Sequence, residues 1–216
     1  MTDAVNLWSE PEHATQYLQR ADTMPHRVAG EQALLEWLSD QPPRVLDLGS
    51  GDGRLLGLVR TACEPREAVV LDFSPAMLER LRERFGNDPA VRVIEHDLER
   101  PLPDLGAFDA IVSSFAIHHL GDERKRTLYR EIFDRLVPGG VFCNLEHVAS
   151  PTPELHLEFL TRLDVRPEDD DPSNKLLDVE TQLAWLRDIG FVDVDCHWKW
   201  RELTLLAGRR PVTGTV

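Results

Sequence analysis

The sequence predicts an α/β protein with a doubly wound, mostly parallel sheet that carries helices on both faces. Short apolar runs alternate five times with helix-like segments between Arg44 and Leu145, and this alternation is typical of parallel sheets. A glycine-rich turn, Gly49-Ser-Gly-Asp-Gly53, directly follows the first run. Ligands of such sheets bind at the carboxyl ends of the strands. The residues that stand at these ends are Gly49, Asp72, Asp97, Ser114 and Glu146.

The first unit predicts a buried strand, a tight turn and a helix. Val45, Leu46 and Leu48 form an apolar run after Pro42-Pro43, as in a buried parallel strand. Glycines in the turn allow positive φ and close approach of a ligand. The helix begins near Arg54, and its first N–H groups suit an anionic group. Arg54 also replaces the third glycine of the dinucleotide fingerprint G-x-G-x-x-G, which disfavours a nicotinamide cofactor.

The second unit places a carboxylate at a distance typical of ribose recognition. The strand Ala68–Asp72 ends 23 positions after Gly49, the spacing at which a βαβ unit brings an acidic side chain to a ribose hydroxyl pair. The alternative is that Asp72 caps the next helix. That alternative is less favoured, because Ser74 already precedes Pro75 at the expected helix start.

Three more strands complete the alternation. They are predicted at Val91–Ile94, Phe108–Ser113 and Val141–Leu145, with a helix over Asp122–Leu136 between the last two. Asp97 follows the third strand, where its carboxylate can accept a hydrogen bond from an exocyclic amine such as that of adenine. The same residue can instead cap a turn, so both interpretations stay open.

Segments outside the alternating core are candidates for covering a ligand. Residues 1–25 are polar apart from a few positions such as Trp8 and Tyr17, and Tyr17 lies on the same helix face as Arg20. A helix is predicted over His26–Leu38. Its apolar face comprises Val28, Leu34, Leu35, Trp37 and Leu38.

The C-terminal third departs from the alternation. A short helix is predicted over Leu155–Leu163, and the acidic loop Pro167–Pro172 is expected to be solvated rather than to bind a metal ion. A further helix over Gln182–Asp188 ends at Gly190, a typical C-terminal cap. The chain from Arg209 onward is expected to form a mobile tail.

Composition excludes several classes of partner. The 216 residues include 38 acidic and 24 basic side chains, a net charge of −14, and such a surface repels nucleic acid and anionic membranes. No apolar run approaches the roughly 20 residues of a membrane span, and the first residues lack the pattern of a signal peptide. Cys63, Cys143 and Cys196 suggest neither a disulfide framework nor a metal-binding pair. We therefore expect a cytoplasmic protein.

Five motifs occur in an order that resembles the class I S-adenosylmethionine-dependent methyltransferases, over roughly residues 40–147. They are Asp47-x-Gly-x-Gly-x-Gly53, Leu71-Asp-Phe-Ser-Pro75, His96-Asp-Leu98, Phe108-Asp-Ala-Ile-Val-Ser-Ser114 with His118-His-Leu120, and Leu136-Val-Pro-Gly-Gly140. The His-His-Leu motif resembles the small-molecule type of this family.

The resemblance implies a Rossmann-like, seven-stranded sheet that closes with an antiparallel hairpin and is covered by a helical lid. The hairpin is expected from Phe191–His197 and Trp198–Ala207. The expected division of this single domain is an N-terminal helical lid (1–40), a cofactor-binding core (41–147), an insertion and helix (148–190) and the closing hairpin (191–208).

The resemblance also implies S-adenosylmethionine as the cofactor. Asp47 would hold its ammonium group, Gly49 and Gly51 would approach its methionine part, and Asp72 would bind the ribose hydroxyls. Phe73 and Leu98 would sandwich the adenine and Asp97 would contact its amine. The complete expected set is Arg20, Asp47, Gly49, Ser50, Gly51, Asp72, Phe73, Met77, Asp97, Leu98, Ser113 and Ser114. One departure is Ser114, where relatives often carry asparagine.

Methyl transfer from a sulfonium needs a general base only if the acceptor begins protonated. The candidate catalytic residues are His118, Glu146 and His147, since histidine titrates near neutrality. Adjacent histidines rarely face one pocket together, so His118 or His119 is expected to be structural. The sequence shows no metal-ligand spacing and no G-x-S-x-G elbow.

These observations predict a methyltransferase that acts on a small-molecule acceptor by in-line displacement, as a monomer or homodimer. A methyltransferase acting on a modified tRNA nucleotide is the first alternative, which the acidic charge disfavours. An NAD-dependent oxidoreductase and a non-catalytic S-adenosylmethionine-binding protein are the others. Nucleic-acid and membrane partners are not expected.

Overall fold

Seven strands form one sheet in the order β3-β2-β1-β4-β5-β7-β6 in a computed structural model that describes residues 24–39 and 42–212. The first five strands run parallel, and β7 pairs antiparallel with both β5 and β6. The strands are β1 (Arg44–Leu48), β2 (Glu67–Asp72), β3 (Val91–Glu95), β4 (Phe108–Ser114), β5 (Leu136–His147), β6 (Val192–Trp200) and β7 (Leu203–Arg209). The predicted fold class, including the closing hairpin, is confirmed.

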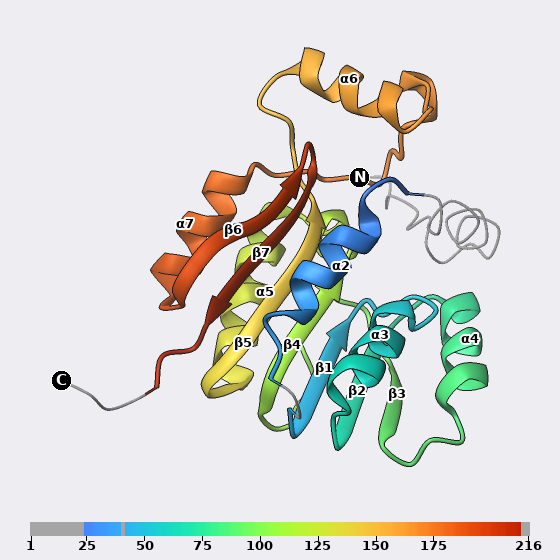
Figure 1. Cartoon of the computed structure of the whole chain (residues 1–216), viewed down its shortest axis with the longest axis vertical. Helices are drawn as coiled ribbons and strands as arrows, with labels where there is room; N and C mark the ends of the chain where they lie inside the picture. The colour runs from blue at the N-terminus through green and yellow to red at the C-terminus, as the bar shows by residue number, and fades with distance from the viewer. Residues whose placement is uncertain (1–23, 40–41, 213–216) are drawn as a thin grey trace.

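Helices cover both faces of this sheet (Figure 1). One face carries α2 (Arg27–Leu35), α3 (Arg54–Cys63) and α4 (Pro75–Phe85), and the other carries α5 (Asp122–Arg135) and α7 (Val179–Ile189). The short helix η2 (Ile117–His119) follows β4. Beyond the carboxyl end of β5 stand α6 (Pro153–Arg162) and η3 (Pro167–Asp169).

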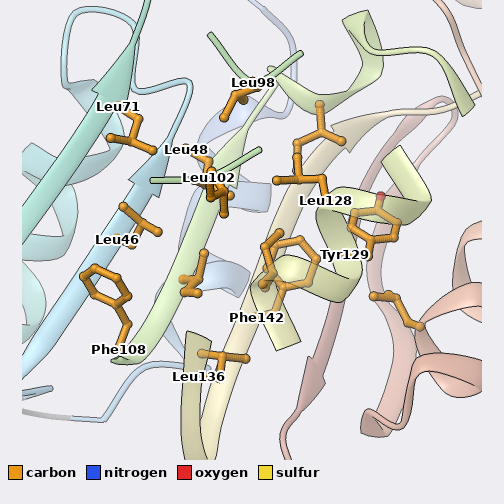
Figure 2. Packing of buried hydrophobic residues seen from close by; sticks show 14 of the residues in the cluster. Leu46, Leu48, Leu71, Leu98, Leu102, Phe108, Leu128, Tyr129, Leu136 and Phe142 are labelled. Carbon is orange, nitrogen blue, oxygen red and sulfur yellow. The ribbon is translucent and has the colours of Figure 1, made fainter. Parts of the chain in front are cut away.

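The central strands are buried on both faces, which explains their continuous apolar runs. Leu46 and Leu48 of β1 pack with Leu128 and Phe142 in the core beneath α5 (Figure 2). Val45 points to the opposite face and packs in the core beneath α2 and α3. Side chains alternate along a strand, so Asp47 also belongs to that second face.

Strand register brings the predicted ligand residues to one edge. Leu48 pairs with both Leu71 and Ser113, and Ser114 pairs with Leu145. The glycine turn therefore begins level with the carboxyl ends of β2 and β4.

The structure corrects the length of the fifth strand. The prediction ended it at Leu145, whereas β5 continues to His147, because Glu146 pairs with Thr204 and His147 with Leu203. Such pairing joins residues far apart in sequence and leaves no local signal. Glu146 and His147 consequently lie on opposite faces of a strand, not in a loop.

The hairpin also turns later than predicted. The first strand does not stop at His197 but continues to Trp200, and the turn lies at Arg201 and Glu202, where Arg201 adopts a positive φ of 53°. Glu202 therefore leaves the strand interior to which the prediction assigned it.

Helix boundaries differ modestly from the predicted ones. Helix α2 ends at Leu35, and Val28, predicted to face the core, is 57% exposed. Helix α7 begins at Val179, earlier than predicted, because the Asp178 side chain accepts a hydrogen bond from the Thr181 N–H and caps it. Gly190 ends α7 with φ of 117°, as predicted.

Candidate functional site

The glycine turn after β1 has one open position. Gly49 and Gly51 both have positive φ, 63° and 56°. A Cβ on Gly49 would lie 2.3 Å from the Cβ of Ala116, so packing alone requires glycine there. A Cβ on Gly51 would meet only the Met77 sulfur, at 4.0 Å. The backbone at Gly51 is thus the place where a ligand can approach closely.

Asp47 is a buried carboxylate to which no described residue donates a hydrogen bond. The residue is 1% exposed, and neither carboxylate oxygen accepts a hydrogen bond within the described part of the chain. Burial raises the pKa of Asp47 to about 7. A positively charged group such as an ammonium would supply the missing partner, so this position fits the amino-acid part of S-adenosylmethionine.

Asp72 joins the end of β2 to the glycine turn. Its Oδ2 accepts from the Gly51 N–H at 2.8 Å and its Oδ1 from the Ser74 N–H at 2.9 Å. Burial raises the pKa of Asp72 to about 6. The alternative role of Asp72, which is to cap the next helix, is supported by this bond to the Ser74 N–H. The Ser74 hydroxyl itself makes no capping hydrogen bond. Each carboxylate oxygen retains a second lone pair, so the ribose role stays a prediction.

The residues expected around adenine lie near the same turn. Leu98 is 7% exposed, and its Cδ1 would be 3.7 Å from a Cβ on Gly49; Figure 2 shows Leu98 beyond Leu48 at the end of the core. Phe73 follows Asp72 and is half-buried. The Oδ1 of Asp97 accepts from the Glu99 N–H at 2.9 Å, so Asp97 does cap a turn.

The three serines of the expected set differ in their contacts. Ser50 donates to the Asp47 carbonyl at 2.9 Å, and the fully buried Ser113 donates to the Leu48 carbonyl at 2.9 Å. Both hydroxyls therefore stabilise the start of the turn. The Ser114 hydroxyl is buried without a partner among the described residues, so it alone has an unused donor.

Glu31 of α2 connects this helix to the start of α3 through hydrogen-bonded ion pairs. It is 2% exposed and accepts from Arg54 at 2.7 and 3.0 Å and from Arg27 at 2.9 Å. No sequence pattern predicts this cluster. Arg20, together with Trp8 and Tyr17, lies outside the described residues, so the predicted N-terminal lid stays a prediction.

His118 and Glu146 form a buried pair at the ends of η2 and β5. The His118 Nδ1 lies 2.6 Å from the Glu146 Oε1, and the residues are 6% and 1% exposed. Burial, with His147 nearby, lowers the pKa of His118 well below its usual value, and burial raises that of Glu146 to about 7. Above that value Nδ1–H donates to the carboxylate and Nε2 carries a lone pair. Nε2 has no hydrogen-bond partner in the described residues, so it can accept a proton.

A buried polar network supports Glu146. Its Oε2 accepts from the Asn144 amide at 3.2 Å, and the Asn144 amide also reaches the Tyr129 hydroxyl at 3.4 Å. Tyr129 donates in turn to the Gln182 Oε1 at 2.7 Å, which links α5 to α7. Sequence reasoning missed these residues; a polar Asn144 inside an apolar strand was the one available signal.

The remaining histidines contact other segments. The His119 ring lies tilted by 43° to the His118 ring, with ring centroids 3.9 Å apart, and its Nδ1 lies 3.0 Å from the Ser173 hydroxyl. Burial lowers the pKa of His119 to about 3. The His147 ring lies 5.6 Å from that of His118, and its Nε2 is 2.8 Å from the Glu202 Oε2. All three rings therefore lie close together, with His119 also contacting Ser173 of the insertion and His147 contacting Glu202 of the hairpin turn.

We call residues 150–176 the cap; together with Ala149 they line an open cleft of about 570 Å³. Its lining residues are Ala149, Ser150, Pro151, Thr152, Pro153, His156, Asp170, Asp171, Pro172, Asn174 and Leu176. The Lys175 N–H donates to the His118 carbonyl at 3.0 Å, which fixes the cap beside the histidine pair. The size suits a small-molecule site.

The described part of the chain contains neither a metal-binding cluster nor a membrane-spanning helix. No group of three or more histidine, cysteine, aspartate or glutamate side chains in that part of the chain could hold a metal ion. None of its helices has the length and apolar character that crossing a bilayer requires. Cys63, Cys143 and Cys196 are free thiols.

Comparisons with known proteins agree with this geometry. Residues 45–140 match the family model for a methyltransferase domain. A demethylmenaquinone methyltransferase from Thermus thermophilus is 35% identical over 116 residues, which are 53% of this chain and 51% of the relative. The chain thus spans about half the length of this curated relative.

Two solved structures share the fold. An O-methyltransferase family protein from Burkholderia thailandensis superposes with a TM-score of 0.72 at 17% identity, covering 96% of this chain and 62% of that one. The N-methyltransferase NodS from Bradyrhizobium japonicum, in complex with S-adenosyl-L-homocysteine, has a TM-score of 0.68 at 17% identity, with coverages of 94% and 99%. Residues 45–140 are thus similar to a methyltransferase domain, and the chain as a whole shares the fold of solved methyltransferases.

Proposed function

We propose that this protein is an enzyme that transfers a methyl group from S-adenosylmethionine to a small-molecule acceptor by in-line displacement. The observation that carries the proposal is that two groups of side chains suited to binding a ligand lie at the same edge of the sheet. Asp47, which has no hydrogen-bond partner among the described residues, lies near the carboxyl end of β1 and precedes the open backbone of Gly51. The His118–Glu146 pair, in which the His118 Nε2 has no partner in the same described part of the chain, lies at the end of β5.

On the cofactor side, S-adenosylmethionine would supply a methyl group already activated by a sulfonium. Asp47 would pair with its ammonium, which offsets the cost of burying the carboxylate. The backbone at Gly51 would lie against the methionine part. Asp72 would accept from the ribose hydroxyls with its remaining lone pairs, while Phe73 and Leu98 would enclose the adenine.

On the acceptor side, the chain is equipped for a nucleophile that begins with an O–H or N–H bond. The His118 Nε2 would take the proton while Nδ1–H continues to donate to Glu146, whose charge stabilises the resulting imidazolium. The cap would hold the acceptor and exclude water. No metal ion is needed for this proton transfer.

The relatives and the charge favour a small molecule over tRNA. The name of the Thermus thermophilus relative specifies demethylmenaquinone, a small acceptor. The net charge of −14 opposes binding to a polyanion. The identity of the acceptor in this protein stays open within that class, provided that it carries a removable proton.

The test is a screen of metabolite pools with methyl-labelled S-adenosylmethionine. We expect a labelled small product with the wild type and roughly 10²-fold less with His118→Gln, the scale of lost general-base catalysis. His197→Gln, which changes an exposed histidine on β6, is the matched control and should retain full activity. Label confined to tRNA would favour the nucleotide alternative. Cofactor binding without any labelled product would favour a non-catalytic role.

A further inference from the structure

A single buried carboxylate, Glu202, holds three segments together at the end of the sheet. It lies in the turn between β6 and β7 and is 1% exposed. Its oxygens contact His147 of β5, the hydroxyl of Ser150 and His156 of α6. Its own carbonyl accepts from the Val148 N–H at 2.8 Å. Burying a charge is costly unless it is paired, so a buried carboxylate with this many hydrogen-bond partners is a structural feature of the fold.

The contact with His147 determines which nitrogen of that ring is free. The His147 Nε2 lies 2.8 Å from the Glu202 Oε2, so this nitrogen is the donor. In the neutral ring Nδ1 is then the acceptor. Because the His147 ring stands 5.6 Å from the ring of His118, Glu202 sets the orientation of a side chain beside the proposed proton acceptor.

The same carboxylate fastens the cap. The His156 Nδ1 lies 3.0 and 3.2 Å from the two Glu202 oxygens. The other nitrogen of His156, Nε2, lies 3.3 Å from the Asp170 Oδ2. His156 therefore bridges Glu202 to the far side of the cap, and both His156 and Asp170 line its cleft.

We infer that Glu202 is a positioning residue that couples closure of the cap to the orientation of His147. With the cap closed, His156 and Ser150 complete the surroundings of the carboxylate and keep water from it. With the cap open, water competes for Glu202, and the bond that orients His147 weakens. The role in methyl transfer rests on the proposed function, whereas the coupling itself does not.

The charges around Glu202 agree with this arrangement. Burial alone would raise the pKa of Glu202, but the hydrogen bonds from His147, Ser150 and His156 hold it below the usual value. The carboxylate therefore stays ionised while the cap is closed. A second contact joins the same elements: Arg201 lies 2.8 Å from Glu158 of α6, at 27% and 46% side-chain exposure. This exposed ion pair provides a matched control.

The first experiment uses the free protein and observes the ring N–H of His147 directly. A carboxylate-bound, buried imidazole N–H gives a downfield proton signal that exchanges slowly with water, and Glu202→Gln should abolish the slow exchange. The coupling predicts that His156→Gln, which cuts only the cap contact, also speeds exchange of the His147 proton by roughly tenfold, the effect of losing one charge-assisted hydrogen bond.

Amide hydrogen exchange of α6 measures the cap in the same variants. His156→Gln should speed exchange of α6 by about tenfold, whereas Glu158→Gln should change it by less than about fivefold, since exposed pairs contribute little. If His156→Gln loosens α6 but leaves the His147 proton unchanged, the coupling is wrong. Equal effects of Glu158→Gln and His156→Gln would also overturn it. Should Glu202→Gln fail to fold, the comparison of these two variants still decides.

A turnover experiment then separates this inference from the proposed function. With an acceptor identified by the labelled screen, His156→Gln should raise the acceptor KM, and Glu202→Gln should lower kcat by at least about tenfold as well. Full kcat in a folded Glu202→Gln protein would remove Glu202 from the reaction. Failure to find any acceptor would count against the proposed function, while the two exchange measurements would still test the coupling.

Discussion

At the residue scale, Asp47 shows how a buried carboxylate lowers the stability of the ligand-free protein. Its carboxylate is buried, unpartnered within the described residues, and near Asp72 and Asp52, whose charges add to the effect of burial on its pKa. A pKa raised from 3.8 to about 7 means that the folded state holds a proton that the unfolded chain releases. The associated stability is fully present below pH 4 and is lost as the pH rises through 7.

We therefore predict that Asp47→Asn stabilises the ligand-free protein at pH 8 by roughly 2–4 kcal/mol, the scale of a shift of about three pKa units. The gain should shrink steadily as the pH falls from 7 and vanish below about pH 3, where the wild-type carboxyl is protonated in both states. Denaturant unfolding at both pH values measures it. The same variant should lose stabilisation by S-adenosyl-L-homocysteine. A stability difference that does not vary with pH would show that Asp47 already has a partner.

The His118–Glu146 pair predicts the pH dependence of turnover. Below about pH 7 the pair holds an extra proton, because burial raises the pKa of Glu146 and lowers that of His118. Above it, Nε2 of His118 is free to act as a base. His147, Lys125 and Asp171 face His118 and modulate this value.

We expect kcat/KM to rise with pH through an apparent pKa near 7. Glu146→Gln should shift the pH at which kcat/KM rises and lower the rate by roughly 10²-fold. A pH–rate profile of both proteins is the measurement. A flat profile from pH 5.5 to 8.5 would indicate an acceptor that needs no base.

Asp72 combines a structural and a proposed binding role, which one substitution series can separate. Asp72→Ala should weaken S-adenosyl-L-homocysteine binding by about 1–3 kcal/mol, the value of charge-assisted hydrogen bonds. Calorimetry measures this. Asp97→Ala, which removes a turn cap, should cost less, since a contact to one exocyclic amine is a single hydrogen bond. Unchanged affinity in folded Asp72→Ala would exclude Asp72 from the site.

At the element scale, Glu31 joins α2 to the glycine turn. It accepts from Arg54 and Arg27 while 2% exposed, so Glu31→Gln removes a buried charge from two ionic contacts. We predict a loss of about 2–3 kcal/mol in the free energy of unfolding and faster amide exchange along α2.

Glu67→Gln is the control for that prediction. Glu67 accepts two bonds of 2.9 Å from Arg44, but the pair is 35% and 27% exposed. Its loss should cost less than about 1 kcal/mol. Equal effects of the two substitutions would mean that the burial of Glu31 contributes nothing to fastening α2.

Elements were predictable where their signals are local. Gly190 ended α7 and the glycine turn followed β1 as the sequence indicated, because positive φ is favourable only for glycine. The extension of β5 to His147 and the turn at Arg201 and Glu202 were not predicted. Both depend on pairing with β7, which no periodicity within either strand specifies.

At the scale of the whole molecule, net charge limits the partners. With 38 acidic and 24 basic residues, we predict no tRNA complex at physiological salt by fluorescence anisotropy. A sub-micromolar complex whose affinity falls steeply with salt would instead support the tRNA alternative. A protein of similar size with a basic RNA-binding surface serves as the positive control.

The sequence by itself determined the architecture and predicted the cofactor half of the candidate site, which stays a prediction. Alternating apolar runs imply a parallel sheet, and a parallel sheet binds its ligands at the strand ends, where Asp72 stands; the proposed roles of Asp47 and Gly51 came from the resemblance of their motif to the methyltransferases. Only the tertiary structure decided the acceptor half. His118 contacts Glu146, which lies 28 residues away along the chain, and His147 contacts Glu202, which lies 55 residues away. Such contacts depend on how the cap and hairpin pack, because a hydrogen bond is specified by position in space and not by distance along the sequence.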